Sequence, residues 1–253
     1  MATGVTGFDP LDLSSTPAGA PLVPRLPIRM RRTEILTVVY RTGRDAAGAL
    51  VPQPLELASD LCVLHVYHMH DAEWFGNYCE SAWQLPVTLP DGTPAVYSPF
   101  LVLESDGAVA AGREAYGQPK KAGQVCLEGR GDLLVGTVAR NGIDVATVTM
   151  CWKQNASSGT ELDRLVPGAG LNVNLRVRQE EEGVISRELV TRRFTDVVEH
   201  EAWTGPATLE LRPNAQLPAH LLAVREVVLG LHRTIDLTLS PGRIVHRYPG
   251  GPA

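Results

Sequence analysis

The chain is poor in several kinds of residue, and each shortage excludes a class of protein. Its 253 residues include only four cysteines, which are far apart and form no C-x-x-C pair. Disulfide scaffolds are built on closely spaced cysteines, so we expect reduced thiols in a cytoplasmic protein. The 23 basic residues are outnumbered by 28 acidic ones, and the net charge of -5 argues against a nucleic-acid partner. No apolar run approaches the ~20 residues that cross a bilayer, so no membrane partner is expected.

The sequence also lacks a metal-binding motif. His65, His68 and His70 are close together, and in a strand His68 and His70 would share one face while His65 would take the other. A metal site would need a third ligand on the right face, and no H-E-x-x-H spacing is present. We therefore expect strand and pocket histidines without a metal.

Strand signals dominate what is present. Residues 171–178 alternate apolar and polar side chains without a break, as in a strand with one buried face. The other predicted strands are residues 35–40, 61–69, 95–103, 133–138, 143–150, 187–198, 207–211 and 235–239. Four dipeptides are predicted to form turns: Asp91-Gly92, Asp106-Gly107, Asn141-Gly142 and Glu182-Gly183.

Helical signals are few and short, so the fold is predicted to be mainly β. Asp45 is predicted to cap a helix that ends before Pro52, and residues 221–231 fit either a helix or a strand. Many strands at short spacing favour a closed antiparallel barrel or a sandwich. Residues 1–28 are expected to form a flexible arm that could pack on a neighbouring subunit, and residues 29–253 a single domain.

Two adjacent lysines, Lys120 and Lys121, are the strongest candidates for chemistry. They follow Gly117 and Pro119 and come after a long apolar run, which suggests a lysine at the edge of a core. Burial disfavours the charged ammonium, and a neutral lysine is a nucleophile toward carbonyl compounds. From the dipeptide alone, solvated surface charges are the simpler interpretation.

The surrounding segments resemble the acetoacetate decarboxylase family, in order from about residue 33 to residue 248. They include Val39-Tyr40-Arg41-Thr42, Met69-His70-Asp71, Tyr78-Cys79-Glu80-Ser81, Pro119-Lys120-Lys121 and His200-Glu201-Ala202-Trp203-Thr204-Gly205-Pro206. The resemblance implies a closed, cone-like antiparallel β-barrel that encloses the active site, with few short helices, assembled into a homo-oligomer. It also implies that Lys120 is the Schiff-base lysine, that Glu80 is the catalytic glutamate and that Lys121 is its lysine neighbour.

The implied chemistry is an imine between Lys120 and a small keto acid. The iminium acts as an electron sink, so no cofactor is expected. A β-carboxylate can then leave as carbon dioxide, or a proton can leave and the enamine can attack an aldehyde co-substrate. Glu80 is a candidate proton shuttle for either path.

Three positions depart from the pattern that the resemblance implies for decarboxylases. Thr33 replaces an arginine that precedes the glutamate of the first strand, His65 replaces an acidic residue, and Gln118 replaces an aromatic residue. Arg32 is a candidate substitute for that arginine, although a shift of one residue turns a strand side chain to the other face. Gln118 and His65 could hydrogen-bond an oxo-acid or aldehyde oxygen, and Lys121 is a further candidate for substrate binding.

These departures keep other activities open. Branches of the same superfamily catalyse pyruvate aldol condensation with dehydration, hydration of unsaturated oxo-acids, or cyclisation of 2-oxo acids in natural-product pathways. A non-catalytic barrel that binds a small ligand is a third alternative, against which the retained Lys120 and Glu80 argue.

Overall fold

The computed structural model describes residues 22–23, 25–180 and 183–249, and the predicted arm at residues 1–28 lies mostly outside them. The helices are α1 (Arg44–Gly48), α2 (Asp106–Tyr116) and α3 (Thr160–Leu165), with a 3-10 helix at Ala219–Leu221. The strands are β1 (Ile28–Arg41), β2 (Glu56–Leu57), β3 (Leu61–Ala72), β4 (Gly76–Thr88), β5 (Pro94–Leu103), β6 (Lys120–Ala122), β7 (Gln124–Arg130), β8 (Leu133–Arg140), β9 (Ile143–Cys151), β10 (Asn155–Ala156), β11 (Leu171–Glu180), β12 (Gly183–Thr204), β13 (Ala207–Leu211), β14 (Glu226–Leu239) and β15 (Arg243–Arg247).

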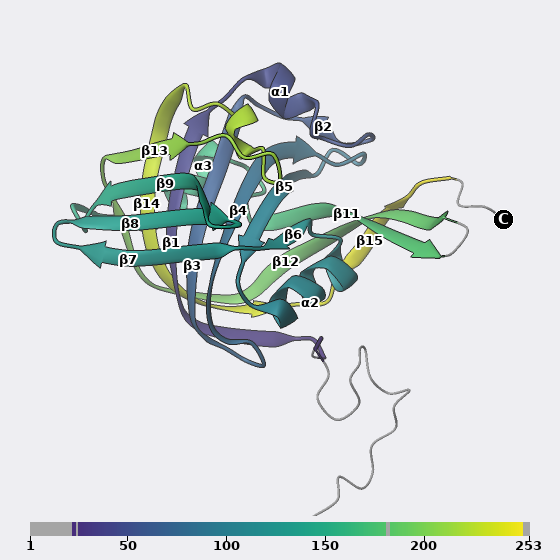
Figure 1. The fold of residues 1–253 in the computed structure, drawn as a ribbon, viewed down its shortest axis with the longest axis horizontal. Coiled ribbons are helices and arrows are strands. Elements are labelled where there is room, and N and C mark those ends of the chain that lie inside the picture. Colours follow the sequence, from purple (N-terminus) through teal and green to yellow (C-terminus); the bar gives the residue numbers. More distant parts are fainter. Residues whose placement is uncertain (1–21, 24, 181–182, 250–253) are drawn as a thin grey trace, which may run out of the picture.

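A large sheet closes on itself and forms the body of the molecule. Its strands run in the order β4-β3-β1-β14-β12-β11-β5, and β5 pairs again with β4 to complete the ring. These pairings are antiparallel except between β5 and β11, and β6 extends the sheet parallel to β5. A smaller sheet, β13-β9-β8-β7, lies across β3 and β4 (Figure 1). The fold is therefore mainly β, as predicted.

Alternation along the strands gives the large sheet two different faces. On β1 and β3, side chains such as Leu36 and Val66 point outward and form a buried core with Leu134 and Val148 of the small sheet. The next residues along β1 and β3 point into the ring. The outer face thus supplies packing between the sheets, and the inner face is left to line a cavity.

Three local predictions were wrong. Asp45 does not cap its helix but lies in the first turn of α1, whose N-cap is Gly43. Asp106-Gly107 is not a turn but the start of α2, where the Ser105 hydroxyl accepts a hydrogen bond from the Ala108 N–H at 3.3 Å. Strands β4 and β7 were not predicted; most of β4 is buried, so alternation does not mark it. The ambiguous segment 221–231 ends the 3-10 helix and begins β14. Within the described residues, no helix is long and apolar enough to cross a membrane.

Candidate active site

Strand β5 places Glu80 and Lys120 beside each other. Glu80 on β4 pairs with Leu103 on one side of β5, and Lys120 on β6 pairs with Leu101 on the other. Leu101 and Leu103 are two residues apart, so they share a face of the sheet, and residues paired across strands project to that same face. The register therefore directs both the carboxylate and the ammonium into the ring.

The turn between α2 and β6 fixes the start of the lysine strand. Gly117 has a φ of 70°, and a side chain there would lie 2.4 Å from the Arg176 backbone, so only glycine fits. The N–H groups of Gly117 and Gln118 donate to carbonyls of the last helical turn. The Arg113 guanidinium also donates to the Lys120 carbonyl at 3.2 Å. Helix α2 thus fixes the turn before Lys120 and also the Lys120 carbonyl.

Lys120 and Glu80 form a buried ion pair. Lys120 Nζ lies 3.0 Å from Glu80 Oε2, and the two side chains are 9% and 8% exposed. Burial lowers the pKa of Lys120 below its ordinary value; the Glu80 carboxylate opposes this, and the charge on Arg192 adds to it. The lysine is consequently easier to deprotonate than one in water.

The pair lies in a small cavity of ≈ 40 Å³. That is room for about three or four water-sized groups. Gly112 and Gln118 form part of its wall on the α2 side. The remaining wall is largely apolar and aromatic, from Met30, Tyr67, Met69, Phe75, Tyr78, Ala82, Leu101, Ala108, Ala111, Tyr116, Phe194 and Leu239. Such a site is largely apolar and admits only small ligands.

Arg192 is a pocket residue that the sequence analysis missed. It lies on β12, is 8% exposed and lines the cavity together with Lys120 and Glu80. Its guanidinium stacks on the Phe194 ring at 4.1 Å. The Arg192-Arg193 pair was a usable signal, because neighbouring residues on a strand point to opposite faces and one arginine must face inward.

The structure places the candidate substrate-binding residues differently. Gln118 lines the small cavity, with its amide nitrogen 3.5 Å from the Asn172 oxygen. His65 lines a second, adjoining cavity of ≈ 290 Å³, which shares Tyr67, Gln84, Arg192 and Phe194 with the first. Thr33 is buried but lines neither cavity.

His65 is held as a neutral side chain. Its ring nitrogens lie 2.9 Å from Thr37 Oγ1 and 3.1 Å from Gln84 Oε1. Burial, with the positive charge of Arg233, lowers the pKa of His65 to about 3. At neutral pH the His65 ring can therefore donate and accept hydrogen bonds but carries no charge.

Two of the predicted substrate contacts do not reach this cavity. Lys121 points away, and its Nζ donates to the Gln216 carbonyl at 2.5 Å, because adjacent strand residues alternate. Arg32 sits at an irregularity of β1 with a φ of 53°, is exposed, and donates its backbone N–H to Asp236. Neither residue can bind a ligand held by Lys120.

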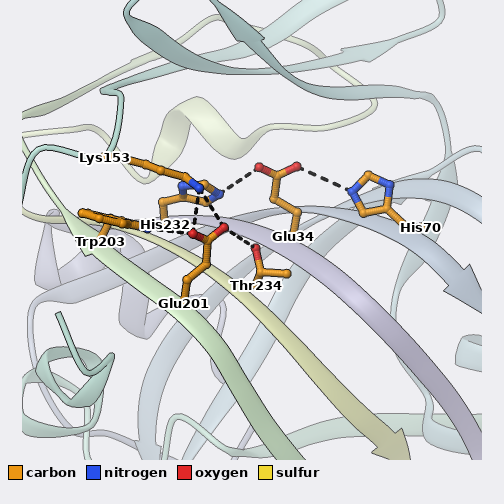
Figure 2. A network of polar contacts seen from close by, with 7 residues as sticks. All are labelled: Glu34, His70, Lys153, Glu201, Trp203, His232 and Thr234. Atoms are coloured by element: carbon orange, nitrogen blue, oxygen red, sulfur yellow. Dashed lines mark hydrogen bonds and ion pairs between the residues drawn. The ribbon is translucent and has the colours of Figure 1, made fainter. Parts of the chain in front are cut away.

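Unlike His65, His68 and His70 lie on the outer face of the sheet, and Figure 2 shows His70 beside Glu34 in a polar network. Glu34 accepts from His232 at 2.8 Å and lies 3.6 Å from His70. Ligand atoms of Glu34, His68 and His70 lie within 4.8 Å of one another, so the third group that sequence analysis did not find is present. These residues do not line the cavity. Glu34 on β1 contacts His232 on β14 and His70 on β3, so the cluster links three neighbouring strands.

Nearby, Glu201 anchors a second part of this network. Its carboxylate accepts from Lys153 at 2.7 Å and from the Trp203 ring N–H at 3.0 Å. These contacts lower the pKa of Glu201 to about 2. Trp203 thus belongs to this network, and it lines neither cavity.

Comparison with known proteins agrees with this architecture. The sequence model of the family "Acetoacetate decarboxylase (ADC)" matches residues 11–249, starting within the predicted arm. The acetoacetate decarboxylase of Acidiphilium cryptum is 38% identical over 233 residues, which cover 92% of this chain and 94% of that protein.

Solved structures give the same result. A structure from "Structural Studies of Acetoacetate Decarboxylase" superposes with a TM-score of 0.89 at 34% identity, covering 95% of this chain and 98% of the other. The enduracididine biosynthesis enzyme MppR complexed with pyruvate shares the fold, with a TM-score of 0.77 at 19% identity over 92% and 97% of the chains. This chain belongs to the acetoacetate decarboxylase family.

Proposed function

We propose that this protein is a Schiff-base-forming lyase that acts on a small keto acid through Lys120. The observation that carries the proposal is the buried Lys120–Glu80 pair, 3.0 Å apart in a cavity with a largely apolar wall. A lysine whose pKa is lowered by burial has a larger neutral fraction at pH 7, and the neutral amine is the nucleophile. The covalent imine replaces a cofactor.

The first steps are common to all candidate reactions. Neutral Lys120 Nζ adds to the ketone carbon to give a carbinolamine, and loss of one water gives the iminium. With a β-keto acid, the bond to the carboxylate breaks, its electron pair moves into the iminium, and carbon dioxide leaves. Glu80 takes up from solvent the one proton that the reaction consumes and passes it to the enamine carbon, and hydrolysis by one water releases the ketone and the free lysine.

A second reaction is favoured by the residues that depart from the family pattern. With pyruvate, Glu80 would accept a proton from the methyl carbon beside the iminium, and the enamine would attack an aldehyde. Loss of the new hydroxyl as water gives a conjugated product. Thr33, His65 and Gln118 motivate this alternative, and so does the shared fold of MppR, a structure of which contains pyruvate.

Borohydride trapping tests the covalent step. The protein is incubated with acetoacetate or pyruvate, reduced, and measured by intact mass spectrometry. We expect an adduct that carries the mass of pyruvate, or with acetoacetate that of the acetone left after decarboxylation. It should disappear in Lys120→Ala and persist in Lys121→Ala, whose ammonium points away from the cavity. Absence of an adduct with either keto acid would overturn the proposal.

Product analysis then separates the two reactions. Carbon dioxide released from acetoacetate supports decarboxylation, whereas a conjugated product from pyruvate and an aldehyde supports aldol condensation with dehydration. A wild-type protein that forms the adduct but gives neither product would contradict both assignments.

A further inference from the structure

Arg192 is a buried charge that forms no ion pair among the described residues, although the more distant Glu80 carboxylate acts on it electrostatically. Its guanidinium is always protonated near neutral pH. Among the described residues no carboxylate forms an ion pair with it, and its Nε atom has no hydrogen-bond partner. Its recorded contact is the face of Phe194, 4.1 Å away. Burial disfavours an unpaired charge, so an anion that reached the guanidinium would stabilise it.

The position of Arg192 suits its charge to binding an anion. It lines the same cavity as Lys120, and these two are the only cationic side chains of the described residues in that lining. Glu80 already pairs with Lys120, which leaves the guanidinium free for an anion that enters the cavity. Because both cations line the same small cavity of ≈ 40 Å³, one small molecule can contact both of them.

A keto acid carries the two groups that this arrangement selects. We propose that Arg192 binds the carboxylate of the substrate while Lys120 attacks its ketone carbon. A guanidinium recognises a carboxylate through paired, charge-assisted hydrogen bonds. Arg192 thereby takes the part that the sequence analysis assigned to Arg32, from a different strand of the ring.

The adjoining cavity extends the inference to substrate size. Arg192 lies in the wall that the two cavities share, and the second cavity is larger, at ≈ 290 Å³, with His65 and Arg233 among its lining residues. A carboxylate held at this wall leaves the second cavity for water or for a larger substituent. Arg233 is 3.9 Å from Glu199, and Arg193, which also lines the second cavity, is exposed and does not line the first. Among the described residues, Arg192 is therefore the cation that borders both cavities.

This inference rests on the proposed function, and its test separates the two. The concentration of keto acid that gives half-maximal borohydride trapping is measured for the wild type and for Arg192→Met, with acetone as the neutral ketone. We expect the value for pyruvate and acetoacetate to rise about 10- to 100-fold, as for the loss of charge-assisted hydrogen bonds, and that for acetone to change less than about twofold. Measurements at pH 7 and pH 9 correct for any change in lysine protonation.

Two further variants make the test specific. Arg187→Met removes an exposed arginine from the same strand and is expected to leave trapping unchanged. Arg192→Lys keeps a positive charge and is expected to recover part of the affinity. If the wild type traps pyruvate and Arg192→Met traps it at the same concentration, the inference is overturned.

A binding measurement that needs no imine tests Arg192 even if no ketone forms an adduct. Acetate or isobutyrate should raise the melting temperature of the wild type and of Arg187→Met, but not that of Arg192→Met. If no ketone forms an adduct, the proposed function fails while this carboxylate test still decides the role of Arg192. Equal shifts in the wild type and Arg192→Met would contradict carboxylate binding.

Discussion

At the scale of single residues, Lys120 experiences opposing influences. Burial favours its neutral form, whereas the Glu80 carboxylate 3.0 Å away favours the ammonium, and the net result is a lowered pKa. The same carboxylate is suited to move a proton at the carbon beside the iminium. Glu80 therefore slows the first step by stabilising the charged amine and assists the later ones.

Replacement of Glu80 separates these two effects. In Glu80→Gln the carboxylate no longer raises the pKa of Lys120, so we expect the pH midpoint for adduct formation with acetone to move to a lower pH. Turnover of keto acid should fall about 100-fold or more, because general acid–base catalysis contributes factors of that order. Borohydride trapping between pH 5 and pH 10 measures the midpoint, with exposed Glu114→Gln as the control. A midpoint that stays in place or rises would show that the Glu80 carboxylate does not raise the pKa of Lys120.

Sequence reasoning succeeded for some of these residues and failed for others. The resemblance identified Lys120 and Glu80, which the fold brings together by pairing both strands with β5. Lys121 and Arg32, the further candidates for substrate binding, do not line the cavity. Adjacent strand residues alternate, which turns Lys121 away, and Arg32 lies at an irregularity of β1 that the sequence does not reveal. Arg192 was missed although the Arg192-Arg193 pair indicated that one of the two faces inward; the sequence does not show which one, or that β12 joins the ring beside Lys120.

At the scale of elements, helix α2 acts as the wall behind the lysine. Gly112 on α2 packs so closely that an added Cβ would lie 2.4 Å from Lys120 Cδ and 3.0 Å from the Gln118 amide oxygen. The Asp106-Gly107 dipeptide misled the prediction of this element, since Asp and Gly suit both a turn and a first helical turn. The Ser105 cap and the left-handed Gly117 mark the helix ends more reliably.

A methyl group at Gly112 should therefore affect the site more than the fold. In Gly112→Ala the Lys120 side chain must move, so we expect the rate of keto-acid turnover and of adduct formation to fall roughly 10-fold or more, as for a misplaced catalytic group. Gly48→Ala in α1 is the matched control, because the nearest atom to an added Cβ there is Leu57 Cδ2 at 4.0 Å, an ordinary contact. Kinetics and thermal melts of both variants check this. Full activity in Gly112→Ala would show that the lysine does not depend on this contact.

At the scale of the whole molecule, closure of the ring through β4 and β5 creates the interior. Its pairings join distant segments: β1 with β14, and β5 with β11 in parallel. Alternation in the sequence located most of these strands but not their partners, because any two half-buried strands satisfy the same pattern. The order of strands, and with it the cavity, could be expected only from the family resemblance.

Burial of His65 inside this ring makes global stability sensitive to acid. The folded protein holds His65 with a pKa of about 3, whereas an unfolded chain has a histidine pKa of about 6.5. Below pH 6.5 the unfolded state binds a proton that the folded state refuses until about pH 3. The free energy of unfolding should thus fall with decreasing pH across this window, by at most about 1.4 kcal/mol per pH unit from this group.

His65→Gln isolates that contribution, because glutamine does not titrate and its amide can still hydrogen-bond Gln84. At pH 7 the variant should be less stable than the wild type, since the packing and the 2.9 Å contact with Thr37 are altered. As the pH falls from 7 to 4, the difference in unfolding free energy between the two proteins should narrow. Only the wild type loses stability through protonation of residue 65 in the unfolded state. Urea unfolding at a series of pH values measures this, with half-buried His246→Gln as the control. A difference that stays constant between pH 7 and pH 4 would mean that His65 is not held neutral by the fold.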